Sequence, residues 1–204
     1  MNEIKNIIFD LGGVFLNLEF KKTEQAFIDL GINDFSELFS FSHSEPLFEN
    51  LEVGKISPQE FYDGFRLLAH LNLSDKEIET AWNAMLLDFP EERLNWLETI
   101  KQKYNVFLFS NTNQIHLDRF EEIYFHQFKK NNFRNYFIKA YFSNEVGFKK
   151  PNKESYLKIL EEQNLIATET LFIDDTLKNI VGAQEAGLQT IHLAAPTTVL
   201  KLNL

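Results

Sequence analysis

Five short apolar runs most constrain the fold of this chain. They are residues 4–10, 106–110, 138–143, 170–174 and 189–193. Their length and their β-branched and aromatic content predict strands. Between the later runs we predict helices that begin near Pro90 and Pro151, and a third from 177 to 186 that stops at Gly187. Strands that alternate with helices predict an α/β fold, a three-layer, Rossmann-like parallel sheet with right-handed crossovers.

The stretch from residue 18 to residue 88 interrupts this alternation, because it contains helix starts but no convincing strand. Residues 57–60 (Ser-Pro-Gln-Glu) and 74–77 (Ser-Asp-Lys-Glu) are capping boxes. The phenylalanines that can pack a small bundle here are Phe35, Phe39, Phe41, Phe48, Phe61 and Phe65. We therefore predict an α/β core from residues 1–17 plus 89–204 and an inserted all-helical cap from 18–88. A plain helical crossover is the alternative, although 71 residues is long for one connection.

Charge and composition exclude several kinds of partner. The formal net charge of the 204 residues is −10, so a nucleic-acid partner is not expected. The chain has no cysteine, which suits a cytoplasmic enzyme. The N-terminus lacks the apolar core of a signal peptide, and no apolar run approaches the ~20 residues that span a bilayer. We expect no membrane partner, and the sequence leaves the oligomeric state open.

Polar side chains end three of the predicted strands. Asp10 ends the first, Ser110 the second, and the pair Asp174 and Asp175 follows the fourth. Because parallel strands bring their carboxyl ends to one edge of the sheet, where ligands bind, these side chains are expected to meet there. Lys150, just before Pro151, supplies a cation to the same set.

Each segment taken alone has an ordinary explanation. Aspartate before Gly12 is a common turn former, Ser110 and Asp175 can cap helices, and the lysines at 149 and 150 can be a solvated pair. Together they offer a carboxylate nucleophile or ligand, an anion-binding hydroxyl, a cation and the hard oxygen donors that suit Mg²⁺.

The four segments, in this order and strand context, resemble the haloacid dehalogenase superfamily of hydrolases, and the helical insert looks like that family's cap. Within the superfamily the chain is most similar to bacterial α-D-glucose-1-phosphate phosphatases. The stretches that carry the likeness are residues 9–14, 52–57, 110–113, 147–151 and 172–175, with Asn179.

The resemblance implies catalytic and phosphate-binding roles. Asp10 would attack phosphorus and form an aspartyl-phosphate that water then hydrolyses. Ser110 and the backbone of Asn111 would bind phosphoryl oxygens. Lys150 would neutralise charge, in preference to Lys149, because it directly precedes the proline.

The resemblance also implies a Mg²⁺ site. Its ligands would be the Asp10 carboxylate, the backbone carbonyl of Gly12 and Asp175, with Asp174 as the second choice. Asn179 stands where many members carry a further acid, so it would be an outer-shell polar group.

One position departs from the pattern of typical phosphatases in the superfamily. They carry an aspartate two residues after the nucleophile as general acid and base, and here that position is Gly12. The loss of general acid help, typically ~10²–10⁴ in rate, should favour leaving groups that need little protonation. A sugar 1-phosphate is such a substrate. Water or a cap residue could supply the proton, and the candidates are His43, Glu45, Glu49 and Glu52, each of which can equally be a surface charge.

Two rival functions remain open. A 2-haloacid dehalogenase also uses an aspartate and a lysine, and Tyr156 fits its pattern, but such enzymes generally lack the acids at 174 and 175. The other rival is a weakly catalytic phosphate-binding or interaction module, which Gly12 favours. The sequence favours a Mg²⁺-dependent phosphatase of a small phosphorylated metabolite, most simply a sugar 1-phosphate.

Overall fold

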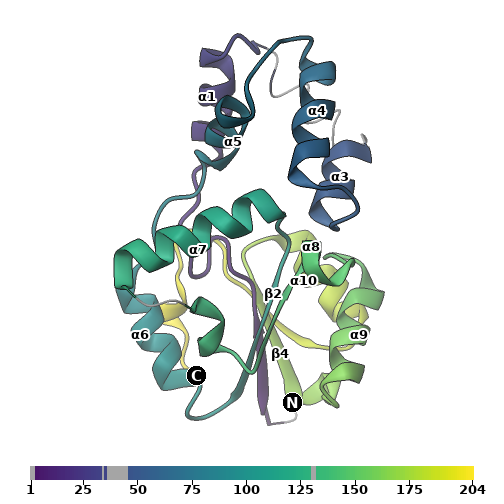
Figure 1. Cartoon of the computed structure of the whole chain (residues 1–204). Coiled ribbons are helices and arrows are strands. Elements are labelled where there is room, and N and C mark those ends of the chain that lie inside the picture. The colour runs from purple at the N-terminus through teal and green to yellow at the C-terminus, as the bar shows by residue number, and fades with distance from the viewer. Residues whose placement is uncertain (1–2, 34, 36–45, 130–131) are drawn as a thin grey trace.

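The strands form one parallel sheet. The computed structural model describes residues 3–33, 35, 46–129 and 132–204. Within that part of the chain the sheet has five strands: β1 (Asn6–Phe9), β2 (Asn105–Ser110), β3 (Lys139–Phe142), β4 (Thr170–Asp174) and β5 (Gln189–His192). All neighbours are parallel, in the order β3-β2-β1-β4-β5 (Figure 1). The predicted α/β fold is confirmed.

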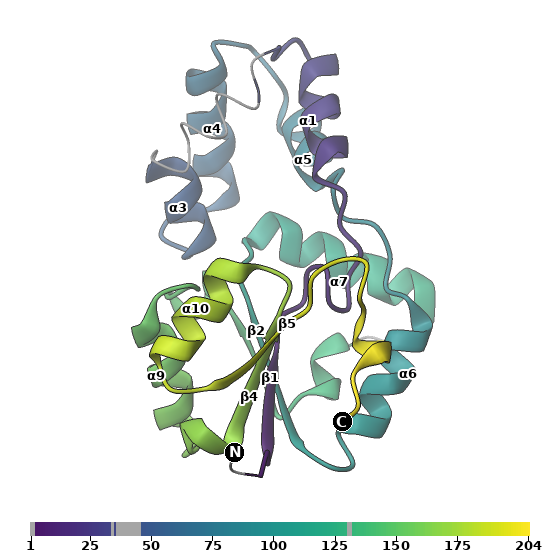
Figure 2. The ribbon, with the colours of Figure 1, turned by 180° about the vertical axis from the view of Figure 1, so that it is seen from behind.

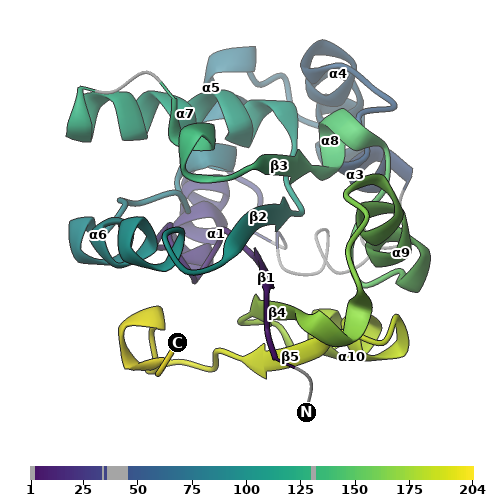
Figure 3. The ribbon, with the colours of Figure 1, turned by 90° about the horizontal axis from the view of Figure 1, so that it is seen from below.

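Helices cover both faces of the sheet, which makes three layers. Helices α6 (Glu91–Ile100) and α7 (Gln114–Phe128) lie on one face, and α9 (Lys153–Glu162) and α10 (Leu177–Glu185) on the other (Figure 3). Alternate residues of β1 point to opposite faces, so Ile7 and Phe9 pack on the α6–α7 side and Ile8 on the α9–α10 side. A strand buried on both faces reads as a continuous apolar run, which is how the sequence revealed it.

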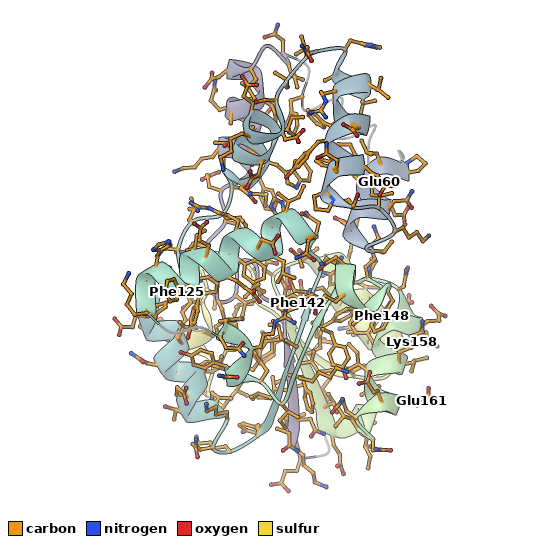
Figure 4. All side chains as sticks on the ribbon, viewed as in Figure 1. Glu60, Phe125, Phe142, Phe148, Lys158 and Glu161 are labelled. Atoms are coloured by element: carbon orange, nitrogen blue, oxygen red, sulfur yellow. The ribbon has the colours of Figure 1, made fainter. Side chains whose placement is uncertain are left out.

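The helix boundaries differ slightly from the prediction. Pro90 is the N-cap residue of α6, one position before the helix, and α9 begins two residues after Pro151. Gly187 follows α10 with a φ of +87°, as expected of a helix stop. Short helical turns complete the core: α8 (Ser143–Val146), Phe133–Tyr136, Ala167–Glu169 and Val199–Lys201. In the side-chain view, Phe142 at the end of β3 lies in the interior and Phe125 on the outer side of α7 (Figure 4).

A helical cap lies beyond the carboxyl edge of the sheet (Figures 1 and 2). Its described helices are α1 (Phe20–Asp29), α3 (Pro46–Glu52), α4 (Pro58–Ala69) and α5 (Asp75–Asn83). Both predicted capping boxes form. The Ser57 backbone N–H donates to the Glu60 carboxylate at 2.8 Å, and the Ser74 N–H donates to that of Glu77 at 2.7 Å.

Aromatic side chains fill the cap. Phe27, Phe35, Phe48, Phe61 and Phe65 are buried together. The expectations for Phe39 and Phe41 lie outside the described residues. Ile115, from the first turn of α7, belongs to the same cluster, so the cap interior continues onto the core.

Two linkers that run side by side join cap and core. The Asn17 N–H donates to the Asp88 carbonyl at 2.9 Å, and the Leu87 N–H donates to the Asn17 carbonyl at 3.1 Å. This pairing supports the cap boundaries at 18 and 88, which remain predictions. In the described part of the chain, no helix has both the length and the apolar character needed to cross a membrane.

Candidate active site

The candidate site residues meet at the carboxyl edge of the sheet. Asp10 directly follows β1, Ser110 ends β2, and Asp174 ends β4 with Asp175 next. Lys150 comes from the loop between α8 and α9. Segments that are up to 165 residues apart in the sequence therefore present their polar groups in one place.

Lys150 bridges two of the carboxylates. Its Nζ lies 2.6 Å from Asp10 Oδ1 and 2.7 Å from Asp174 Oδ2. The lysine is 2% exposed, Asp10 8% and Asp174 not at all. Charges this deeply buried are stable only when they are paired and hydrogen-bonded. The neighbouring Lys149 ammonium points elsewhere and contacts Glu52 of the cap at 2.8 Å. Lys150 as the site lysine, in preference to Lys149, stays a prediction that this geometry supports.

Asn111 holds the backbone of Lys150. Its side-chain amide donates to the Lys150 carbonyl and accepts from the Lys150 N–H, both at 2.9 Å. On the far side, the loop packs closely on α10, because a Cβ at Gly182 would lie 1.9 Å from the Pro151 carbonyl oxygen. These contacts fix the backbone of Lys150, from which its side chain extends into the site.

Asp174 is fully engaged by protein donors. Besides Lys150, it accepts from the Thr176 N–H at 2.8 Å and from the Asn179 side chain at 3.1 and 3.0 Å on its two oxygens. The Asn179 carbonyl in turn accepts from the Tyr156 hydroxyl at 2.8 Å. Tyr156 is a fully buried core residue that packs on Phe172, so its place is explained without dehalogenase chemistry.

Asp175 is the more open carboxylate. It is exposed, and its carboxylate accepts from the Thr176 hydroxyl at 3.2 Å. A Cβ at Gly13 would lie 2.2 Å from Asp175 Oδ2, and Gly13 has a φ of +71°, so glycine makes room for this carboxylate. One oxygen each from Asp10, Asp174 and Asp175 fall within 4.8 Å of one another. Hard oxygen donors at this spacing fit Mg²⁺, with Asp175 better placed than Asp174 to give an oxygen.

Burial and charge set the protonation of the cluster. Burial raises the pKa of Asp10 to about 7 against the opposing effect of Lys150, and Asp174 adds to the rise. Burial and Asp174 also raise the pKa of Asp175. Burial disfavours the Lys150 ammonium, but Asp10 and Asp174 outweigh it and keep its pKa above the ordinary value. A cation bound here would relieve the crowding of negative charge.

This crowding predicts a pH effect on stability. The pKa of Asp10 is about 7 when folded against 3.8 ordinarily, so the metal-free native state binds more protons than the unfolded state between these values. Its free energy of unfolding must then fall as pH rises across that window, relative to Asp10→Asn, which cannot titrate. Urea unfolding of both proteins in EDTA at about pH 5 and about pH 7.5 checks the sign. A wild-type-to-variant difference that is independent of pH would contradict it.

The other side of the site is shaped for an anion. Ser110 is 4% exposed at the end of β2, and no hydrogen bond between described residues uses its hydroxyl. The Thr112 N–H is already taken by the Ser143 hydroxyl at 2.9 Å, and the Asn113 side chain caps α7. The Asn111 side chain is engaged by Lys150, so only its backbone can serve a ligand. Among residues 110–113, the hydroxyl of Ser110 and the N–H of Asn111 therefore stay available to a ligand.

The candidates for a replacement acid are only partly placed. Glu52 and Glu49 lie 2.8 and 3.8 Å from Lys149 Nζ, so both are at the cap–core contact. His43 and Glu45 lie outside the described residues.

A further histidine, His116, lies at the contact between the cap and the core, and the sequence did not indicate it as a candidate acid. Burial lowers its pKa to about 3, so it is neutral and not an acid at pH 7.

The sequence did not indicate His116 or Arg93, because both make their contacts with segments that are distant in the chain. His116 Nδ1 is 2.9 Å from Asn83 Oδ1, and its ring stacks on Trp82 of the cap. Arg93 reaches the loop after β1. Nothing in the sequence near His116 or Arg93 indicates these partners, because each pairing depends on how α5, α6 and α7 pack.

The strand order, the helical cap and the lysine between two carboxylates are together those of the haloacid dehalogenase-like hydrolases. A model of the family described as haloacid dehalogenase-like hydrolase matches residues 7–193. The chain belongs to this family.

Individual relatives cover nearly the whole chain. A D-ribitol-5-phosphate phosphatase of Bacteroides thetaiotaomicron is 33% identical over 93% of this chain and 91% of its own. A sesquiterpene phosphatase of Aspergillus oryzae is 28% identical over 93% and 89%. A solved family enzyme of B. thetaiotaomicron, in complex with magnesium and inorganic phosphate, has a TM-score of 0.85 at 36% identity, covering 95% of this chain and 96% of its own.

Proposed function

We propose that this protein is a Mg²⁺-dependent phosphatase that hydrolyses a small sugar or sugar-alcohol phosphate through an aspartyl-phosphate on Asp10. It is a phosphoric monoester hydrolase like its relatives. The observation that carries the proposal is the Lys150 ammonium placed 2.6 Å from Asp10, beside two further carboxylates. Lysine and Asp10 alone would also suit a dehalogenase, so the acidic pair at 174 and 175 decides for a phosphatase.

In the first step an Asp10 oxygen attacks phosphorus, and the bond from phosphorus to the leaving alcohol oxygen breaks. Lys150 and the donors at Ser110 and Asn111 would hold the non-bridging oxygens, whose charge persists throughout the transfer. Because Lys150 and Asn111 are fixed by buried contacts, little reorganisation of these two residues is needed when the phosphate arrives.

In the second step water attacks the phosphorus of the aspartyl-phosphate, which releases inorganic phosphate and restores the Asp10 carboxylate. Gly12 offers no side chain to take the proton from this water or to give one to the leaving alcohol. A water molecule or a cap residue would carry the proton. Helices α1 and α3–α5 stand over this edge and would limit the entry of bulk water.

Asp10, Asp175 and the Gly12 carbonyl would hold Mg²⁺, with Asp174 as the alternative. When bound, the ion supplies Lewis-acid stabilisation of the phosphoryl charge. Asp174 is better described as the residue that orients Lys150, because donors occupy both of its oxygens.

Two observations bear on the substrate. Gly12 favours an ester whose alcohol leaves readily, which supports a sugar 1-phosphate. The relative that is 33% identical acts on D-ribitol 5-phosphate, which supports an ester of an ordinary primary alcohol. Both are small polyhydroxylated phosphates, and that class is our proposal. A cytoplasmic location is also proposed, supported by the absence of cysteine.

A steady-state screen tests this function. Glucose 1-phosphate, glucose 6-phosphate, D-ribitol 5-phosphate, p-nitrophenyl phosphate and 2-chloropropionate are compared with Mg²⁺ and with EDTA. We expect phosphate release that EDTA reduces by at least about 10²-fold, because the charge-stabilising cation is removed. Asp10→Asn is the control for contaminating phosphatases.

The pattern of substrates decides the finer question. Preference for glucose 1-phosphate over glucose 6-phosphate would support the leaving-group argument from Gly12. Preference for D-ribitol 5-phosphate would favour the alditol phosphates. Halide release from 2-chloropropionate without Mg²⁺ would overturn the phosphatase assignment.

A further inference from the structure

Arg93 contacts the loop that follows the candidate nucleophile. It lies in the first turn of α6, just after the second linker from the cap (Figure 2). Its Nη1 donates to the Val14 carbonyl at 3.2 Å and lies 3.5 Å from the Gly13 carbonyl. Its Nε is buried and has no hydrogen-bond partner among the described residues.

Neighbouring acids do not engage this arginine. Asp88, Glu91 and Glu92 are close in the sequence, yet no ion pair among the described residues involves Arg93. An arginine normally meets a carboxylate when one is within reach, because that hydrogen bond is charge-assisted on both sides. Here the guanidinium is instead directed at two main-chain carbonyls.

The loop needs an external support. The Leu11 carbonyl accepts from the N–H groups of Val14, Phe15 and Leu16 at 3.3, 2.8 and 3.0 Å, which closes the turn from inside. Gly12 and Gly13, however, have no side chains that could restrict the backbone. The carbonyls of Gly13 and Val14 face outward to Arg93, and Gly13 lies against Asp175. The loop is thus held between the Asp175 carboxylate and the Arg93 guanidinium.

We propose that Arg93 is a positioning residue that sets the backbone of residues 12–14, so that the Gly12 carbonyl, Asp10 and Asp175 face Mg²⁺ together. The inference rests on the proposed function, because it assumes that this edge binds the ion. Arg93 itself touches neither ion nor substrate. Its contribution is to reduce the conformations that the glycine pair can adopt before binding, which strengthens binding.

Mg²⁺ binding without substrate tests the role. The dissociation constant is measured by calorimetry for the wild type, Arg93→Met and Arg93→Lys. We expect Arg93→Met to weaken Mg²⁺ binding about tenfold, equal to about 1.4 kcal/mol, and Arg93→Lys, which keeps charge and a donor, to recover most of it. With saturating Mg²⁺, the kcat of Arg93→Met should rise toward that of the wild type.

Arg134→Met is the matched control. Arg134 is another partly exposed arginine, which bridges Glu121 of α7 and Glu145 of α8. Its replacement should lower the melting temperature without changing Mg²⁺ affinity. If Arg93→Met does not fold, Arg93→Lys carries the test, with an expected two- to threefold weakening.

The outcomes separate the two claims. Mg²⁺ affinity of a folded Arg93 variant equal to that of the wild type overturns the positioning role and leaves the proposed function standing. A wild-type protein that binds no Mg²⁺ overturns both. If Arg93→Met and Arg134→Met weaken Mg²⁺ binding equally, the weakening reflects general destabilisation of the protein. That result would also overturn the positioning role of Arg93.

Discussion

Asp10→Asn is expected to lower kcat by at least about 10⁴-fold and to leave the protein folded. The amide is close in size and shape to the carboxylate but is a very poor nucleophile toward phosphorus. The variant also removes a buried carboxylate whose pKa burial raises to about 7, so ionisation at this position no longer costs stability above that pH. Activity and folding should therefore separate in this variant.

The measurement is the initial rate of phosphate release with saturating Mg²⁺ and the best substrate of the screen, with the circular dichroism melt recorded beside it. Asp118→Asn, the same substitution at a surface aspartate of α7 that accepts from Gln114 at 2.6 Å, is the matched control. It should retain full activity. Hydrolysis by Asp10→Asn within tenfold of the wild type would remove the nucleophile assignment.

Lys150→Met is expected to produce the largest loss of stability, about 3–5 kcal/mol in EDTA near pH 8. It leaves Asp10 and Asp174, which share the Lys150 ammonium, buried without a counter-charge. The loss should shrink at about pH 5, because Asp10, whose pKa burial raises to about 7, can then take up a proton. We also expect kcat to fall at least about 10²-fold, since a fixed cation at the phosphoryl group is lost.

Lys149→Met is the control that the chain itself provides. The neighbouring lysine is 22% exposed, and its partner Glu52 lies 2.8 Å away in a more open ion pair. Such a pair typically contributes less than about 1 kcal/mol, so urea unfolding should distinguish the two lysines clearly. Equal losses for the two variants would contradict the assignment of the buried bridge to Lys150.

The fold was largely predictable because its signals are local. Runs such as 171–173 are apolar at every position, as strands covered on both faces must be. The helical stretches between such runs leave a parallel sheet as the simplest arrangement. The capping boxes at Ser57 and Ser74 are equally local, and both form. Exact helix starts were less predictable, because proline is tolerated just before a helix as well as in its first turn.

The site was predictable only in part. The carboxyl ends of parallel strands must meet, so Asp10, Ser110 and Asp174 could be brought together from chain order alone. The preference for Lys150 over Lys149 rested on the family resemblance. Two adjacent lysines have the same ammonium group, so the sequence does not show which of them points into the site. The Asn111 side chain bound to the Lys150 backbone, and Arg93 at the Val14 carbonyl, depend on packing between distant helices and loops. No pattern in the chain indicates them.

Trapping the aspartyl-phosphate tests the central claim most directly. The wild type, Asp10→Asn and Asp118→Asn are mixed with substrate carrying labelled phosphate and Mg²⁺, quenched in acid within milliseconds, and digested for mass spectrometry. Our account predicts a hydroxylamine-sensitive phosphoryl group on the peptide that contains Asp10, in the wild type and Asp118→Asn but not in Asp10→Asn. Full-rate hydrolysis with no phosphoryl group on that peptide, or with the label on another residue, would contradict it.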